Sequence, residues 1–195
     1  MRLRRPSNDL GFTLIELMVT VAVMAILLVV AAPSFMSFFD KARLRGAADD
    51  LVSFIADART ESVKRNRNVN VAFGGTVTAW CIGAKDADAG VTTTPGDLIP
   101  STFLPCDCAT PSGCLVAGQQ KTLSSTSYGG VVISAVPAAV VFDSRLGAVT
   151  PLGTTTVTLT SPRRTFDLQM TLSPLGQTTL CVPAGKPSVS GFSPC

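Results

Sequence analysis

The sequence has no histidine, and its 195 residues include only one Trp, one Tyr and 15% charged side chains. Histidine is the commonest general base and the usual partner of a Ser or Cys nucleophile, so its absence removes most of the support for a hydrolase. The remaining carboxylates are expected to be solvated, because Asp49 and Asp50 fall in a helical stretch and Asp86, Asp88 and Asp97 in a Gly/Thr/Pro-rich stretch. We therefore predict no catalytic residues and no cofactor.

The chain also lacks a strong excess of one charge. Its net charge is +3, but residues 1–11 hold three of the arginines and one aspartate, which leaves 13 basic and 12 acidic side chains in residues 12–195. A nearly neutral protein has no overall field to attract nucleic acid or anionic lipid, so any such attraction must come from a local patch.

What the sequence does have is a long apolar run from Phe12 to Ala32. At about 1.5 Å per residue, this run is roughly 30 Å long as a helix, which is the thickness of the bilayer's hydrocarbon core. Three arginines precede it, opposed by one acid: Arg2, Arg4, Arg5 and Asp9. The positive-inside rule then predicts that residues 1–11 stay in the cytoplasm and that the chain beyond Pro33 crosses the membrane.

One acidic residue, Glu16, interrupts the apolar run. Such a residue costs roughly 2.5–3.5 kcal/mol at the centre of a spanning helix, so an intramembrane carboxylate indicates a function and needs a partner. A secretory signal would place its cleavage site after the apolar run, whereas here the small residue Gly11 comes before it. Cleavage between Gly11 and Phe12 would leave the whole apolar helix on the mature protein.

This arrangement resembles the class III signal of type IV prepilins and pseudopilins, on the residues Gly11, Phe12, Thr13, Leu14, Glu16 and Pro33. The resemblance implies that an inner-membrane prepilin peptidase cuts before Phe12 and methylates its new amine. It also implies that Glu16 meets the amine of Phe12 on a neighbouring subunit during assembly. The alternative is an uncleaved signal anchor in which the carboxylate of Glu16 reaches toward water.

Six cysteines lie beyond the span: Cys81, Cys106, Cys108, Cys114, Cys181 and Cys195. In an oxidising compartment these favour disulfides, and six cysteines allow fifteen complete pairings. We favour Cys181 with Cys195, which would close the C-terminal tail and contribute on the order of 3 kcal/mol. The alternative is a four-thiolate zinc site formed by the other four cysteines, although paired C-x-x-C motifs are missing.

After Pro33, apolar and small residues recur at intervals of three and four, the period of one helical face. They are Phe35, Phe38, Phe39, Ala42, Ala47, Leu51, Phe54, Ile55, Ala58 and Ser62. We predict one helix over residues 12–66, with 12–32 in the membrane, a kink at Pro33, a weak point at Gly46 and an i,i+4 ion pair between Glu61 and Arg65 on its solvated face.

From Asn68 the apolar period changes to two, which predicts a β-hairpin from Val69–Phe73 and Thr76–Ile82. Residues 83–118 are rich in Gly, Pro and Thr and predict a long surface loop held by disulfides. Further strands are expected at 119–125, 130–136, 139–142, 154–160, 165–172 and 177–182. The fold class is therefore α+β, with a leader (1–11), a long N-terminal helix (12–66) and a β-rich exported domain (67–195). The resemblance to prepilins implies that this domain is antiparallel and pilin-like.

Further residues resemble the FimT/FimU/GspH group of minor pilins and pseudopilins. They are Leu51, Ala58-Arg59, Glu61-Ser62, Lys64-Arg65-Asn66, Val69, Val141-Phe142-Asp143, Gly147, Leu172-Ser173-Pro174, Gly176 and Leu180-Cys181. The resemblance implies a minor pilin that primes assembly of a type IV pilus near its tip. It implies as partners the prepilin peptidase, other minor and major pilins and the inner-membrane assembly platform. The protein would start in the bacterial inner membrane, N-terminus cytoplasmic and C-terminal domain periplasmic, and end on the cell surface.

Two alternative functions stay open. One is a GspH-like pseudopilin of a type II secretion system. The other is a DNA receptor for natural transformation, for which the resembling proteins have a Gly-Arg-x-Arg motif where this chain has Gly176-Gln177-Thr178-Thr179. Because phosphate contacts dominate non-specific affinity for DNA, the two missing arginines disfavour that function. The remaining basic clusters are Lys64-Arg65-Arg67 and Arg163-Arg164.

Overall fold

The computed structural model describes residues 12–87, 106–108, 110, 113–134, 139–150 and 152–195. The chain forms two compact units, Met1–Phe39 and Asp40–Cys195, and the helix α1 (Leu14–Arg65) contributes residues to both. Within the described residues, α1 is the one helix long and apolar enough to cross a membrane. The expected helix over 12–66 is therefore observed, with bounds one or two residues shorter.

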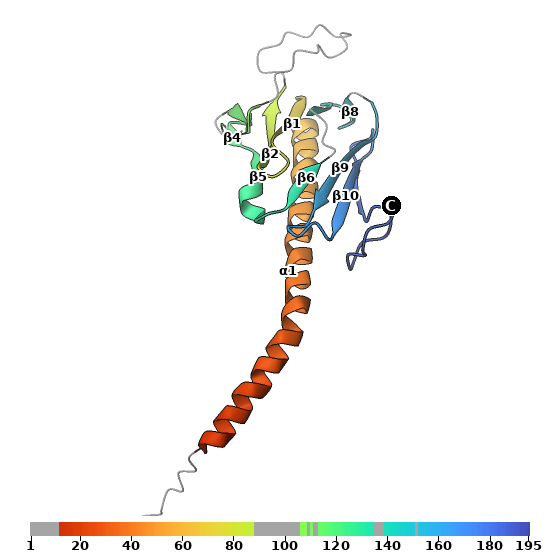
Figure 1. The fold of residues 1–195 in the computed structure, drawn as a ribbon. Helices are drawn as coiled ribbons and strands as arrows, with labels where there is room; N and C mark the ends of the chain where they lie inside the picture. Colours follow the sequence, from red (N-terminus) through yellow and green to blue (C-terminus); the bar gives the residue numbers. More distant parts are fainter. Residues whose placement is uncertain (1–11, 88–105, 109, 111–112, 135–138, 151) are drawn as a thin grey trace, which may run out of the picture. The chain divides into compact units, whose positions relative to one another are not determined.

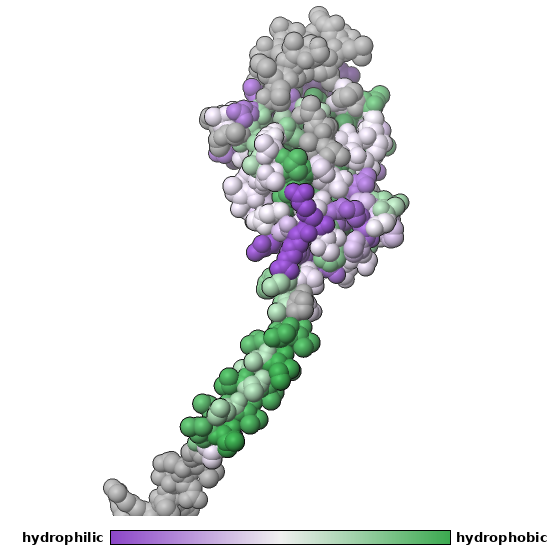
Figure 2. Space-filling view, in the orientation of Figure 1, coloured by the Kyte–Doolittle hydropathy of each residue, from purple (hydrophilic) through white to green (hydrophobic). Residues whose placement is uncertain are grey.

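In the first unit, the described residues are Phe12, Thr13 and the apolar portion of α1. Its large side chains, from Phe12 to Phe39, are exposed. A helix that is apolar on all sides and buries none of them is suited to a non-aqueous surrounding. Figure 2 shows this portion as a continuous hydrophobic surface.

The second unit combines residues 40–65 of α1 with antiparallel strands in two main sheets (Figure 1). One sheet has the order β5-β2-β1-β7-β8, the other the order β11-β10-β9-β6, and β3 and β4 form a separate pair. The strands are β1 (Val69–Gly75), β2 (Trp80–Asp86), β3 (Leu115–Val116), β4 (Gln119–Gln120), β5 (Thr122–Ser124), β6 (Val132–Ser134), β7 (Ala139–Phe142), β8 (Val149–Thr150), β9 (Thr155–Thr160), β10 (Asp167–Leu172) and β11 (Thr178–Cys181). The α+β fold class, with a long helix and an antiparallel β-domain, is confirmed.

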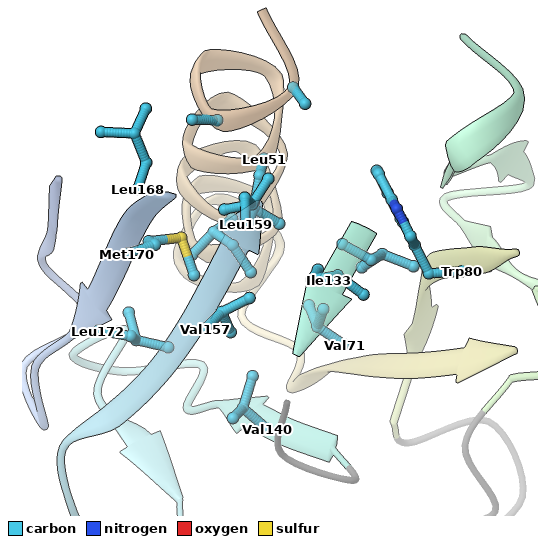
Figure 3. Close-up of a cluster of buried hydrophobic side chains, with 14 of the residues drawn as sticks. Leu51, Val71, Trp80, Ile133, Val140, Val157, Leu159, Leu168, Met170 and Leu172 are labelled. Atoms are coloured by element: carbon cyan, nitrogen blue, oxygen red, sulfur yellow. The ribbon is translucent and has the colours of Figure 1, made fainter. Parts of the chain in front are cut away.

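Backbone hydrogen bonds join the two main sheets at both ends. The amide of Ile133 in β6 donates to Val77 O at 3.1 Å, and the amide of Val149 in β8 donates to Pro174 O at 2.9 Å. Together the sheets form one surface that faces the helix. The shared core contains Leu51 from α1, Val71 and Trp80 from the first sheet, and Leu159 and Met170 from the second (Figure 3).

The helical face that meets the sheets differs in part from the predicted stripe. Its members are the buried residues Asp40, Leu44, Ala47, Ala48, Leu51, Ile55, Ala58 and Ser62. Phe35, Phe38, Phe39 and Ala42 are exposed, so their assignment to this face was wrong. The three phenylalanines belong to the first unit. In the second unit, residues three or four positions apart share a helical face, so Leu44 and the acidic Asp40 lie on the same face as Ala47 and Leu51, and Ala42 does not.

The predicted bounds of the loop 83–118 were also wrong. Strand β2 continues through Gly83 to Asp86, because its register with β1 pairs Gly83 with Ala72 and Asp86 with Val69. At the other end of the predicted loop, Leu115 and Val116 form β3. The short strand β8 was not predicted, since two residues are too few to show a period.

Three disulfides link the cysteines: Cys81–Cys108, Cys106–Cys114 and Cys181–Cys195. The last is the pair favoured from the sequence. The first two take up all four sulfurs of the alternative zinc site, so no thiolates remain there to bind a metal. These two disulfides pack over Gly83, where a Cβ atom would lie 2.3 Å from Cys114 Sγ and 2.6 Å from Cys106 Sγ.

This close approach predicts opposite effects for two glycine substitutions. Gly83→Ala should lower the free energy of unfolding by about 2 kcal/mol, because the added methyl must displace two bonded sulfurs. Gly46→Ala, in α1 with nothing within 4 Å of the added Cβ, should raise it by about 1 kcal/mol through helix propensity. Urea unfolding of the full chain in detergent, followed by the fluorescence of the single Trp80, measures both. Equal effects of the two variants would contradict the packing argument.

Candidate assembly site

The N-terminal end of α1 begins at a capped first turn. Thr13 accepts a hydrogen bond from the Glu16 amide on its Oγ1 at 3.3 Å, and its carbonyl accepts from the Leu17 amide at 3.2 Å. Thr and Glu at this spacing form the sequence pattern of a capping box. The Glu16 carboxylate also lies in the first turn, where the positive pole of the helix favours negative charge.

The side chains of this turn are available to another molecule. Phe12 is 83% exposed, and Glu16 is exposed as well. Among the described residues, the Glu16 carboxylate has no hydrogen bond or ion pair. Gly11 lies outside the described residues, so the cleavage position stays a prediction. Pro33 falls within α1, and the kink expected there also stays a prediction.

At its other end, α1 is held to the β-domain by Arg59. Arg59 Nε donates to Gly147 O at 3.1 Å. Both Gly147 and Gly176 have positive φ, and a Cβ at Gly176 would lie 2.4 Å from Gly147 O and 2.8 Å from Arg59 Nε. The turns after β7 and β10 therefore approach the helix closely enough to exclude any side chain at either glycine.

Next to Arg59, the buried Ser62 adds a second link between α1 and the turn after β7. Its hydroxyl donates to Arg59 O at 2.7 Å and lies 3.3 Å from Asp143 O. Asp143 shapes that turn by accepting from the amides of Arg145 and Leu146. We call this group of residues the helix–turn clasp. It brings together three segments that are far apart in the sequence: Arg59 and Ser62, Asp143 and Gly147, and Gly176.

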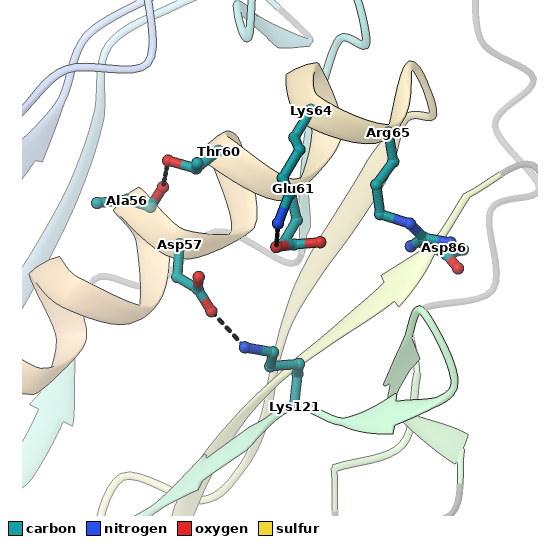
Figure 4. Close-up of polar contacts among 8 residues, drawn as sticks. All are labelled: Ala56, Asp57, Thr60, Glu61, Lys64, Arg65, Asp86 and Lys121. Carbon is teal, nitrogen blue, oxygen red and sulfur yellow. Dashed lines mark hydrogen bonds and ion pairs between the residues drawn. The ribbon is translucent and has the colours of Figure 1, made fainter.

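Charged residues of α1 also reach across to the β-domain (Figure 4). Asp57 pairs with Lys121, and Arg65 Nη1 donates to Asp86 Oδ1 at 2.7 Å. The predicted ion pair between Glu61 and Arg65 was wrong: Glu61 instead pairs with Lys64 at 3.7 Å. The half-buried Asp86, placed at the end of β2, recruits Arg65 because a carboxylate removed from water needs a partner.

On another side of the helix, Asp50 accepts a hydrogen bond from the hydroxyl of Tyr128 at 2.6 Å. The ring of Tyr128 stacks on the buried Trp80, with centroids 5.8 Å apart. Burial raises the pKa of the Tyr128 hydroxyl, and the hydrogen bond to the Asp50 carboxylate raises this pKa further. Sequence reasoning missed this contact because nothing near either residue in the chain indicates the other.

Two protein families match the chain. The prokaryotic N-terminal methylation motif matches residues 6–32, and the family described as type II transport protein GspH matches residues 47–176. An apolar helix with a methylation motif, joined to an antiparallel β-domain, defines the class of minor pilins and pseudopilins. Within this class, the chain belongs to the GspH family, whose matched region covers most of the core of the β-domain and the whole helix–turn clasp.

Two crystal structures of the type IV minor pilin FimU of Pseudomonas aeruginosa are similar, at 15% and 14% identity with TM-scores of 0.48 and 0.42. They cover 73% and 70% of this chain and 91% and 90% of their own. No curated protein matches the chain.

The helix–turn clasp predicts a difference between two glycines of similar conformation. Gly176 and Gly185 have φ of +74° and +79°, but only Gly176 has atoms within 4 Å of an added Cβ. Gly185→Ala should cost about 1–2 kcal/mol of stability from backbone strain alone. Gly176→Ala should cost about 2 kcal/mol more, because its methyl overlaps Gly147 O and Arg59. Urea unfolding gives both values, and equal losses would refute the close-approach argument.

Tyr128 predicts a loss of stability at alkaline pH. Its pKa is raised in the folded state, so its contribution is complete below the unfolded pKa of about 10 and is lost as pH rises above it. Since Tyr128 is the single tyrosine, absorbance at the tyrosinate band reports this group alone. We expect tyrosinate to appear well above the pH at which free tyrosine ionises. Tyr128→Phe should show a smaller decrease in unfolding free energy over this pH range, and an unshifted titration of the wild type would contradict the prediction.

Proposed function

We propose that the protein is a minor pilin that is incorporated into a type IV pilus and primes its assembly at or near the tip. The observation that carries this proposal is the N-terminal methylation motif over residues 6–32, combined with a capped helix that exposes Phe12, Glu16 and an apolar surface. Such a helix is stable in lipid and can leave it only for another apolar surrounding. A bundle of similar helices provides one, so the role is structural and needs no enzymatic chemistry.

The first turn supplies the polar contact for this transfer. In the proposed sequence of events, prepilin peptidase cleaves after Gly11 and methylates the amine of Phe12. The amine of one subunit then pairs with the Glu16 carboxylate of its neighbour in the helix bundle. An opposite charge compensates the cost of a carboxylate in an apolar surrounding. Cleavage must come first, because it creates the amine. The N-terminus starts on the cytoplasmic side, and the β-domain starts in the periplasm.

A second candidate is a pseudopilin of a type II secretion system. The matching family is described as a type II transport protein, which favours this function as directly as it favours a pilus subunit. Both functions use the same helix and the same Glu16 contact, and they differ in the machine that the subunit joins. Piliation and protein secretion, measured in one deletion strain, separate them.

A DNA receptor is less well supported than either. Residues 177–179 are uncharged at the position of the Gly-Arg-x-Arg motif. In the basic clusters named above, Lys64 pairs with Glu61, Arg65 with Asp86, and Arg163 with Asp40. These three cations already have acidic partners, whereas Arg67 and Arg164 of the same clusters have none among the described residues, so the argument against a DNA receptor rests mainly on the two missing arginines of the motif.

The assembly role of Glu16 is tested in a deletion strain complemented with variants of the full chain. Glu16→Ala and Glu16→Gln should both be cleaved normally, as judged by gel mobility, and should both fail to restore pili or secretion, because neither supplies a negative charge. Glu61→Gln, a matched change on the same helix outside the apolar portion, should restore function. Wild-type filament numbers and secretion with Glu16→Gln would refute the charge contact.

A further inference from the structure

Six basic side chains lie together at one end of the second unit, and we call them the basic collar. Three are on the first turns of α1 in this unit, two are in the turn between β9 and β10, and one is in the C-terminal segment: Lys41, Arg43, Arg45, Arg163, Arg164 and Lys186. All except the half-buried Lys41 are exposed. Figure 2 shows hydrophilic side chains gathered over this part of the β-domain.

Contacts show that these segments form one continuous surface. Arg163 Nε lies 3.7 Å from Asp40 Oδ2, which brings the β9–β10 turn to the start of the helix. Lys41 lies over the ring of Phe166, at 4.6 Å from its centroid. The next residue, Asp167, pairs with Lys186 at 2.7 Å.

The other two arginines of the helix extend the same surface. Arg45 donates to Ser190 O and lies over the ring of Phe192, which joins the C-terminal segment to α1. Arg43 Nη1 donates to Gly129 O at 3.3 Å. The neighbouring Gly130 lies near the β9–β10 turn, because a Cβ added at Gly130 would be 3.1 Å from Pro162 Cβ. Contacts thus hold five of the six cations on one surface, and Arg164 is the exposed neighbour of Arg163 in the same turn.

The collar is positive at its surface because its acids are inside. Asp40 and Asp167 are each 6% exposed, whereas Arg163 and Lys186 keep about half of their side chains exposed while pairing with them. Asp49 and Asp50 are exposed farther along the helix, and Asp50 accepts from Tyr128. Arg43, Arg45 and Arg164 have no acidic partner among the described residues.

The position of the collar in the chain relates it to the membrane. Lys41 comes two residues after Phe39, where the exposed apolar side chains of α1 end. Residues 12–39 as a helix are about 40 Å long, close to the thickness of a bilayer including its headgroups. In a chain anchored by this helix, Lys41 follows the anchoring residues closely, so chain connectivity alone brings the first residue of the collar near the level of the phosphates.

We propose that the basic collar binds the headgroups of anionic phospholipids in the leaflet next to the β-domain, before the subunit enters a filament. Guanidinium and ammonium groups are suited to lipid phosphates, and basic residues beside a span are attracted to an anionic surface. The proposal rests on the proposed function only for membrane anchoring. Because the anchor keeps lipid phosphates at high effective concentration, they occupy the collar ahead of soluble DNA.

The test uses the full chain reconstituted in phosphatidylcholine vesicles with spin-labelled phosphatidylglycerol or phosphatidylcholine as probe. Electron paramagnetic resonance gives the fraction of each probe immobilised by the protein. The wild type should prefer phosphatidylglycerol, and the preference should decrease with added NaCl. The variant Arg43→Gln/Arg164→Asn should lower it about fivefold or more. Asn suits residue 164 because Arg164 has a φ of +58°.

The matched control is Arg67→Gln/Arg145→Gln, which removes two exposed arginines near the other end of α1 and should leave the preference unchanged. Equal selectivity for both lipids in the wild type, or equal losses in both double variants, would overturn the proposal. So would complete displacement by inorganic phosphate at matched ionic strength, which would indicate a site for the free anion. Micromolar binding of duplex DNA to the vesicles that abolishes the lipid preference would instead assign the collar to nucleic acid.

Vesicles contain no assembly machinery, so this result is independent of whether the subunit enters a filament. A chain that shows the lipid preference but does not support piliation or secretion would refute the proposed function alone. A chain that supports either process without the preference would refute the collar alone. Circular dichroism and Trp80 fluorescence verify that the variants are folded.

Discussion

A single helix has to satisfy two different surroundings, and the rest of the structure depends on this constraint. Up to Phe39, α1 is apolar around its circumference and its large side chains are exposed. From Asp40 onward, one face is buried against two sheets and the other carries charge. The change occurs within a few residues and without a break in the helix, so the same element can serve as membrane anchor and as core of the β-domain.

The second portion of α1 is fixed by more than apolar packing. Leu44, Leu51 and Ile55 supply the buried stripe, which is non-directional and would tolerate sliding of the helix. Directional contacts at its edges set the position: Arg59 with the carbonyl of Gly147, and Asp50 with the hydroxyl of Tyr128. Hydrogen bonds that involve a charged group, as both of these do, contribute roughly 1.5–3 kcal/mol each, and they specify one position of the helix among many.

The disulfides fix two further regions of the β-domain, one over Gly83 and the other at the C-terminal segment. Cys81–Cys108 and Cys106–Cys114 lie over Gly83, where the absence of a side chain makes room for the sulfurs. Cys181–Cys195 connects β11 to the last residue of the chain, and the amide of Cys195 donates to Val182 O. The C-terminal segment is thereby held beside Arg45, as part of the basic collar.

The sequence by itself determined the features that depend on neighbours along the chain. These are the apolar run with Glu16 inside it, the long helix, most strands and the likeness to prepilins, because periodicity and motif spacing are local. Only the tertiary structure decided which groups far apart in sequence meet. It exchanged Glu61 for Asp86 as the partner of Arg65, extended β2 through Gly83, placed Asp40 and Leu44 on the buried face, and gathered the collar from three segments. Such contacts follow from strand register and burial, which no local pattern contains.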